Sequence, residues 1–214
     1  ARSPDVTIET LLIRGLGAAA LVLLHVILCI GPLARLDRRF LPLLYNRRHL
    51  GVLMFLLALG HAAFATVQFH ALGDLSPLVS VLSANREVGR LSAFPFQLLG
   101  VGALLSLFLL AATSHDFWLS VLTPRVWKSL HMAVYVAWAL LLGHVALGVM
   151  QAEPGWGLPV ALSVGLVGVT GLHLAAARRE LPRQEEGPRQ HGGWGDVGAA
   201  DEIPDGRAVI RTVG

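Results

Sequence analysis

The sequence is poor in cysteine and in charge. Cys29 is the single cysteine, so disulfide bonds, Cys-x-x-Cys zinc sites and cysteine-ligated iron–sulfur clusters within this chain are excluded. Charged residues make up 14% of the 214 residues, whereas soluble domains carry about 25%. Hydrophobic residues make up 54%, and the mean hydropathy is +0.62. This composition predicts a membrane protein.

Five long apolar segments contain no Asp, Glu, Lys or Arg. They are residues 15–33, 49–73, 91–115, 129–152 and 154–177. A bilayer core needs about 20 such residues in a helix, because a helix satisfies its own backbone hydrogen bonds without water. We therefore predict an all-α membrane protein, a bundle of five transmembrane helices with a short cytoplasmic tail.

The basic residues predict the orientation of this bundle. They gather in segments 34–48, 116–128 and 178–183, and the opposite side carries only Arg2, Arg14, Arg86 and Arg90. Short cytoplasmic loops keep Lys and Arg, so the N-terminus is expected outside and the C-terminus in the cytoplasm. No basic face with interleaved aromatic residues is left over, so the lipid bilayer is expected as a partner and nucleic acid is not.

Two of the nine histidines are expected at the same depth in the membrane. His61 lies 13 residues after Arg48, and His144 lies 16 residues after Lys128. At the rise of an α-helix these separations place both rings roughly 20–24 Å from the basic end. Each follows a Leu-Gly pair, which leaves room for a large planar group. Two imidazoles at one height predict the axial ligands of a haem iron.

His131 cannot join that pair. It lies 13 residues before His144, which corresponds to roughly 20 Å along a helix and about 140° around it. A second haem at the basic end would pair His131 with His49, and Arg47 or Arg48 would contact its propionates. One haem or two therefore remain alternatives.

The other histidines are assigned structural roles. His25 is expected to form a helix-packing hydrogen bond, and His70 faces away from His61 near the outer surface. His115 and His173 lie at span ends, where solvation is expected. The competing interpretation of His61 and His144 is that both rings bond to backbone carbonyls within the membrane.

An ordered set of short motifs resembles the ferric-reductase-like transmembrane superfamily. It is most similar to the haem-binding membrane subunit of the bacterial periplasmic methionine sulfoxide reductase system. The motifs are Gly31-Pro32-Leu33-Ala34-Arg35, Arg47-Arg48, Leu50-Gly51, His61, Pro95, Ala112-Thr113-Ser114, Trp127, Leu130-His131, Val134-Tyr135 and His144.

The resemblance implies a b-type cytochrome of the bacterial inner membrane that moves single electrons. It implies His61 and His144 as axial ligands and His131 as the third histidine of the family, with a redox partner protein or larger membrane complex, and a quinone or flavin as further cofactors. The chain departs from the family in lacking a span before residue 15. It also has Asp74 and Leu75 where two-haem relatives carry a second histidine.

The C-terminal part changes in composition. Residues 1–177 are expected to form the haem-binding domain, 178–193 a flexible linker and 194–214 a separate tail. The tail resembles the first strand and turn of a Rieske iron–sulfur domain, with Asp201 to Gly206 as the turn. Either the sequence is cut before that domain, which would then carry the cluster, or the tail is disordered.

Electron transfer is the favoured function, with no catalytic residue of its own, because a haem with two histidine ligands has no open position for a substrate. The alternative is a haem-free accessory subunit of a larger complex. A transporter with histidine proton carriers is disfavoured because the spans contain no carboxylate. No cleavable signal peptide is evident, and a further upstream span stays open because the sequence begins without Met.

Overall fold

The computed structural model describes residues 7–84, 87, 89, 94–148 and 155–185. These residues form helices and, within the ranges given, no strand, which confirms the all-α fold. The chain divides into two compact units, Ala1–Ala177 and Arg178–Gly214. The expected Rieske-like tail at 194–214 lies outside the described residues.

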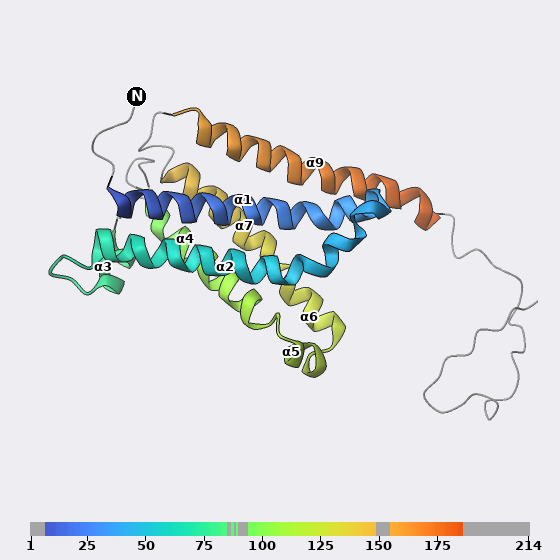
Figure 1. Cartoon of the computed structure of the whole chain (residues 1–214), viewed down its shortest axis with the longest axis horizontal. Coiled ribbons are helices and arrows are strands. Elements are labelled where there is room, and N and C mark those ends of the chain that lie inside the picture. The colour runs from blue at the N-terminus through green and yellow to red at the C-terminus, as the bar shows by residue number, and fades with distance from the viewer. Residues whose placement is uncertain (1–6, 85–86, 88, 90–93, 149–154, 186–214) are drawn as a thin grey trace, which may run out of the picture. The chain divides into compact units, whose positions relative to one another are not determined.

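The described residues form helices of very different lengths (Figure 1). In chain order they are α1 (Ile8–Leu36), η1 (Arg38–Phe40), α2 (Leu41–His70), α3 (Pro77–Ser83), α4 (Phe96–Ala112), α5 (Asp116–Val121), α6 (Pro124–His131), α7 (Ala133–Leu147) and α9 (Gly157–Glu185). Four helical stretches in the described residues are long and apolar enough to cross a membrane, namely Ile8–Leu36, Arg38–His70, Pro124–Leu147 and Gly157–Arg179. α4 is apolar but shorter, with 17 residues.

Local sequence explains where these helices begin. Thr7 caps α1 by accepting a hydrogen bond from the backbone N–H of Thr10, and Thr123 caps α6 in the same way. α4 begins only after Pro95, because a proline disfavours helical backbone at the residue before it. The span predicted at 91–115 is therefore shorter than the four helical stretches that are long enough to cross a membrane. By contrast, α9 continues through residues 178–185, which composition had assigned to the linker.

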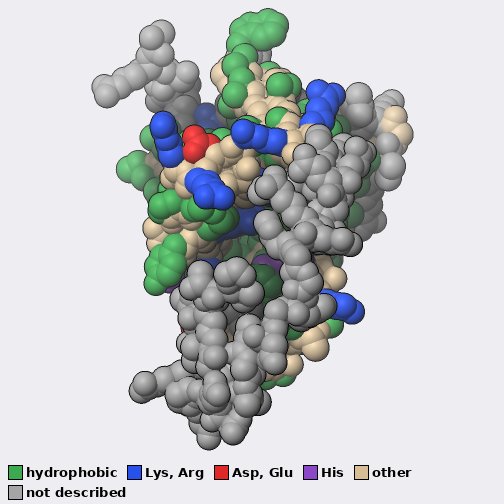
Figure 2. All heavy atoms as spheres, turned by 90° about the vertical axis from the view of Figure 1, so that its right-hand side faces the viewer, with side chains coloured by type: hydrophobic (Ala, Val, Ile, Leu, Met, Phe, Trp, Pro, Cys, Tyr) green, Lys and Arg blue, Asp and Glu red, His purple; other side chains and the backbone are tan. Residues whose placement is uncertain are grey.

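The helices form two hairpins. α1 packs along α2, joined by Asp37 and η1, and α4 packs along α7 (Figure 1). The helices α5 and α6 lie between α4 and α7 in the chain. Lys and Arg side chains gather at the end of the bundle that holds η1 (Figure 2), as the basic loops predict.

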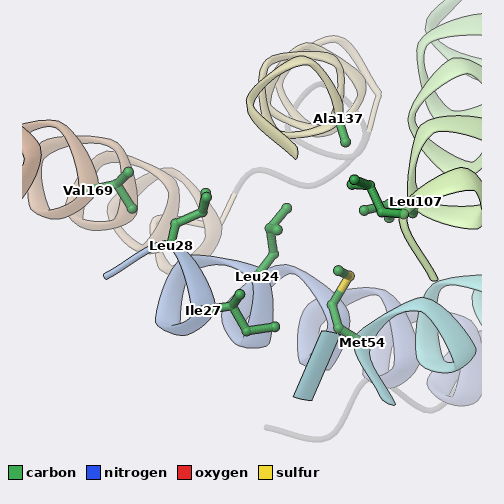
Figure 3. Close-up of a cluster of buried hydrophobic side chains, with 8 residues drawn as sticks. Leu24, Ile27, Leu28, Met54, Leu107, Ala137 and Val169 are labelled. Atoms are coloured by element: carbon green, nitrogen blue, oxygen red, sulfur yellow. The ribbon is translucent and has the colours of Figure 1, made fainter. Parts of the chain in front are cut away.

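A small cluster of buried side chains lies where the two hairpins meet (Figure 3). It consists of Leu24, Ile27 and Leu28 from α1, Met54 from α2, Leu107 and Leu110 from α4, Ala137 from α7 and Val169 from α9. Many other large apolar side chains are exposed, as expected of helices that face lipid.

The two hairpins are related by an internal repeat of 83 residues. Leu24 corresponds to Leu107, Ile27 to Leu110 and Met54 to Ala137, and all six are buried in the same cluster. The same offset relates two pairs of rings in contact. Phe55 corresponds to Trp138 and His25 to Phe108, and the contacts are Phe55–Phe108 and His25–Trp138. Thus α1 and α2 are the counterparts of α4 and α7, and the contact between the hairpins lies on a pseudo-twofold axis.

Candidate functional site

The structure brings His61 and His144 together across the two hairpins. Their ring centroids lie 6.4 Å apart, and the ring planes are nearly perpendicular, at 85°. His61 belongs to α2 and His144 to α7, so each hairpin contributes one ring. The sequence predicted that His61 and His144 lie at the same depth, and in the structure the two rings lie next to each other.

Each of these rings is held by a backbone carbonyl of the neighbouring helix. The Nδ1–H of His61 donates to the carbonyl of Ile13 at 2.8 Å, and that of His144 donates to the carbonyl of Phe96, also at 2.8 Å. Because a carbonyl only accepts, Nδ1 carries a proton in both rings, and in a neutral ring the lone pair then lies on Nε2. The competing interpretation predicted that both rings bond to backbone carbonyls, and the Nδ1 atoms of both rings do so.

Glycines on the facing helices make room for the two rings. A Cβ at Gly17 would lie 2.8 Å from Nδ1 of His61, and a Cβ at Gly100 would lie 2.8 Å from Nδ1 of His144. Any side chain at either position would displace the imidazole. Gly60 and Gly143, which precede the two histidines, allow close contact with Leu16 and Leu99.

The site therefore consists of two equivalent halves. In each half the histidine and its carbonyl partner are 48 residues apart, and the offset of 83 relates Ile13 to Phe96 and Gly17 to Gly100. Sequence reasoning did not identify these four residues. The signal was present in the shared Leu-Gly-His motif, which aligns one hairpin with the other.

His25 forms the packing contact expected of it. Its Nδ1–H donates to the carbonyl of Leu21 at 2.8 Å, and its Nε2 accepts from Nε1–H of Trp138 at 3.2 Å. A Cβ at Gly165 of α9 would lie 2.4 Å from the ring. Both nitrogens have partners, so His25 joins α1 to α7.

His173 is not simply solvated, which corrects the expectation for this span end. Its Nδ1–H donates to the carbonyl of Val169, and the hydroxyl of Tyr135 donates to its Nε2 at 2.8 Å. His115 is exposed and caps α5, in agreement with its expected position. His70 bonds to the hydroxyl of Ser80 at 2.9 Å.

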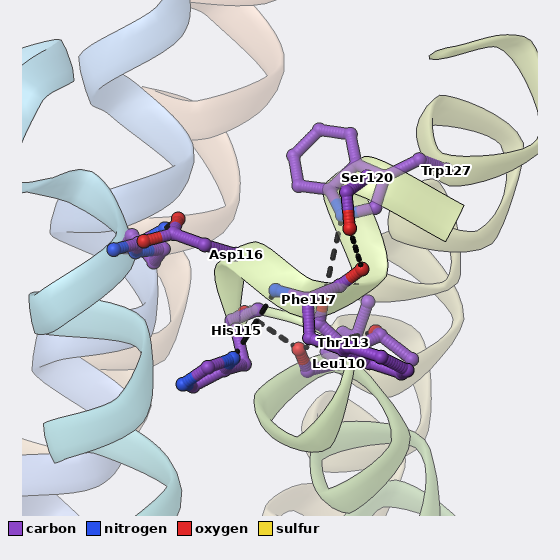
Figure 4. Close-up of polar contacts among 9 residues, drawn as sticks. Leu110, Thr113, His115, Asp116, Phe117, Ser120 and Trp127 are labelled. Atoms are coloured by element: carbon purple, nitrogen blue, oxygen red, sulfur yellow. Dashed lines mark hydrogen bonds and ion pairs between the residues drawn. The ribbon is translucent and has the colours of Figure 1, made fainter. Parts of the chain in front are cut away.

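His131 lies apart from the His61–His144 pair, on α6. Its ring stacks on Trp127 with centroids 3.8 Å apart, and its Nδ1–H donates to the carbonyl of Trp127. The Trp127 ring is in turn held by a hydrogen bond from Nε1–H to the carbonyl of Thr113, drawn in Figure 4. Nε2 of His131 is buried and has no hydrogen-bond partner among the described residues.

The other residues predicted for a second haem site are Arg47, Arg48 and His49. Arg48 forms an ion pair with Asp116, and the Arg48 guanidinium lowers the pKa of that carboxyl through this hydrogen bond and its charge. Arg47 packs near Gly31 of α1, 3.6 Å from the position of a Cβ there. His49 is exposed, and within the described ranges no ring contact joins it to His131. In that same part of the chain, no three His, Cys, Asp or Glu residues form a metal-binding group.

Comparison with known proteins found one matching family. The model of the ferric reductase like transmembrane component family matches residues 15–142. This range contains α2, α4 and the basic segments 34–48 and 116–128, together with His61 and His131, and ends two residues before His144. No solved structure matches the chain.

Proposed function

Because the chain belongs to the family of ferric reductase like transmembrane components, we propose that it is a b-type cytochrome with one haem held between His61 and His144. Membership makes it a transmembrane electron-transfer component. The proposal adds the cofactor, its ligands and its place between the two hairpins.

The spacing of the two rings supports this ligation. Imidazole nitrogen binds a transition metal at about 2 Å, and a ring centre lies about 1.1 Å behind that nitrogen, so two axial rings have centroids roughly 6.2 Å apart. The centroids of His61 and His144 are 6.4 Å apart. The centroid separation is therefore compatible with the binding of one iron between the two rings.

The hydrogen bonds of the two rings support it further. A histidine ligand usually donates its second ring N–H to a carbonyl or carboxylate, which fixes the tautomer and the direction of the ring. Ile13 and Phe96 supply such carbonyls. When bound, the haem iron accepts and releases one electron at a time. The protein holds both rings in place and, with two axial histidines, leaves no position for a substrate.

His131 is proposed as a ligand of a second group near the Arg48 end, either a second haem or a quinone in its reduced quinol form, whose hydroxyl would donate to Nε2. The support is its buried Nε2, which carries a lone pair and lacks a partner in the described part of the chain. Such an atom costs stability unless something binds it. His49, Arg47 and Arg48 remain proposed contributors to this second site, and a flavin remains a further candidate.

We place the protein in the inner membrane of a bacterium, with the N-terminus outside and the C-terminus in the cytoplasm. The supporting observation is the gathering of Lys and Arg at the η1 end of the bundle. A redox protein or a larger membrane complex would supply or accept the electrons.

The test is a dithionite-reduced minus oxidised absorption spectrum of the purified chain in detergent. We expect the bands of a low-spin b-type cytochrome in the wild type and their loss in His61→Ala and in His144→Ala. His115→Ala is the matched control, because this exposed ring caps α5 away from the pair. Full haem content in either pocket variant would refute the ligand assignment. A wild type without haem bands would favour the accessory subunit.

A further inference from the structure

The connection between α4 and α6 is short and begins and ends beside apolar helices. α4 ends at Ala112 and α6 begins at Pro124, and α6 with α7 forms a stretch long and apolar enough to cross a membrane. Residues 113–123 contain α5, which has 6 residues and is therefore about 9 Å long. A connection this short keeps α5 close to the membrane surface at which α6 begins.

α5 carries an exposed apolar face. Phe117, Trp118 and Val121 are 58%, 37% and 59% exposed, and they lie within about 100° of one another around the helix. Asp116 and Ser120 lie outside this arc. The rings of Phe117 and Trp118 contact each other edge to face, with centroids 5.4 Å apart. Large apolar side chains exposed on a helix beside a membrane are typical of elements that insert into the interface.

An ion pair brings this face to the level of a further exposed aromatic residue. Arg48 of α2 pairs with Asp116, the first residue of α5, which is labelled in Figure 4. Phe117 and Trp118 directly follow Asp116, and Tyr45, which is 85% exposed, lies three residues before Arg48. The three aromatic side chains thus lie roughly within one helical turn of the ion pair. Aromatic residues gather in this way at the boundary between lipid and water.

α6 adds two cations that no acidic residue balances. Arg125 and Lys128 are three residues apart, so they lie on the same side of the helix, and both are exposed. Within the described part of the chain neither forms an ion pair. Asp116 is the only acidic residue between positions 113 and 131, and Arg48 already pairs with it. The surface formed by α5 and α6 is therefore complementary to a negatively charged layer.

We propose that α5 and α6 bind the headgroup layer of a membrane that contains anionic phospholipid. Phe117, Trp118 and Val121 insert at the top of the lipid chains, and Arg125 and Lys128 pair with headgroup phosphates. Phosphatidylglycerol is preferred to phosphatidylcholine, because the choline group of the latter already neutralises its phosphate. None of these five residues belongs to the His61–His144 pocket, so lipid binding here does not depend on the haem.

Insertion of α5 is tested with a fluorophore on the full chain in lipid nanodiscs. Cys29→Ala removes the single natural cysteine, and Val121→Cys then carries an environment-sensitive label. We expect quenching of this label by lipids brominated near the headgroup and little quenching by iodide in the water. Ser120→Cys is the matched control, since it lies outside the apolar arc and should be quenched by iodide. Equal iodide quenching at both positions would overturn the proposal and leave the apolar face for a protein partner.

The preference for anionic lipid is tested by titrating phosphatidylglycerol or phosphatidylcholine into the labelled Val121→Cys chain in detergent. We expect tighter binding of phosphatidylglycerol, and a loss of roughly fivefold in its affinity in each of Arg125→Gln and Lys128→Gln. Arg38→Gln, in η1, is the control with the same change of charge and should keep the preference. Equal affinities for the two lipids would contradict the proposal. An equal loss in Arg38→Gln would do so too, because the whole basic end would then attract the lipid.

Discussion

Gly17 lies directly against the imidazole of His61, so close that a single added methyl group would come within 2.8 Å of Nδ1. Gly100 has the same relationship to His144. Two neighbouring helices thus supply both the carbonyl that orients each ring and the space that the ring occupies. The two glycines therefore belong to the same site as the two histidines.

Substitution of either glycine should weaken haem binding. In Gly17→Ala or Gly100→Ala the new Cβ would push the ring away from its carbonyl partner, and overpacking of this kind costs about 1–3 kcal/mol. We expect a reduced haem content, measured by the pyridine haemochrome method. Gly15→Ala is the control, since no atom lies within 4 Å of its added Cβ. Equal haem content in all three variants would show that the rings move without loss of ligation.

Gly165→Ala should destabilise the bundle without removing the haem. Its Cβ would lie 2.4 Å from the ring of His25, which joins α1 to Trp138 of α7. We expect a loss of about 1–3 kcal/mol of stability, read as a lower Tm. Gly168→Ala serves as the control because its Cβ position is open. Loss of haem equal to that of Gly17→Ala would mean that the His25 contact belongs to the pocket.

His131→Phe should preserve the haem of His61 and His144. The phenyl ring can keep the stacking on Trp127, and the change removes a buried Nε2 that has no partner in the described residues. Replacing an unsatisfied polar group with an apolar one is nearly neutral or stabilising. We expect an unchanged main cytochrome spectrum and an unchanged or higher Tm. Disappearance of the main spectrum would show that His131, and not His144, pairs with His61.

The Arg48–Asp116 ion pair should make stability depend on acid pH. Arg48 lowers the pKa of Asp116 in the folded chain, so the pair contributes stability above the unfolded pKa of about 3.9. This contribution is lost as the pH falls through the lower folded pKa. We expect a small difference in Tm between wild type and Asp116→Asn at neutral pH, because both partners are exposed.

That difference should disappear once the pH is well below 4, when Asp116 is protonated in both folded and unfolded chains. Thermal melts monitored by circular dichroism across acid pH would measure it. Asp74→Asn, in the loop after α2, is a control because the same charge is removed from another exposed position. A difference that grows toward low pH would contradict the assigned sign.

Much of the fold and part of the site could be predicted from the sequence. Apolar length alone predicted the helices, and counting residues from the basic loops placed His61 and His144 at one level. The length of α4 was not predicted correctly, because Pro95 lies inside the predicted span and the helix begins only after it. The partner of His173 was also missed, since Tyr135 lies 38 residues away and only helix packing brings the two side chains together.

The amino-acid sequence by itself determined that the chain forms apolar helices and at which depth their residues lie. In lipid, each segment must form its backbone hydrogen bonds within itself, which requires a helix. Because the rise per residue of a helix is constant, counting residues gives the depth of each side chain. Only the tertiary structure decided which nitrogen of each imidazole is hydrogen-bonded and that Gly17 and Gly100 make room for the rings. Those features depend on the rotation and close approach of separate helices, which side-chain packing selects and no single segment encodes.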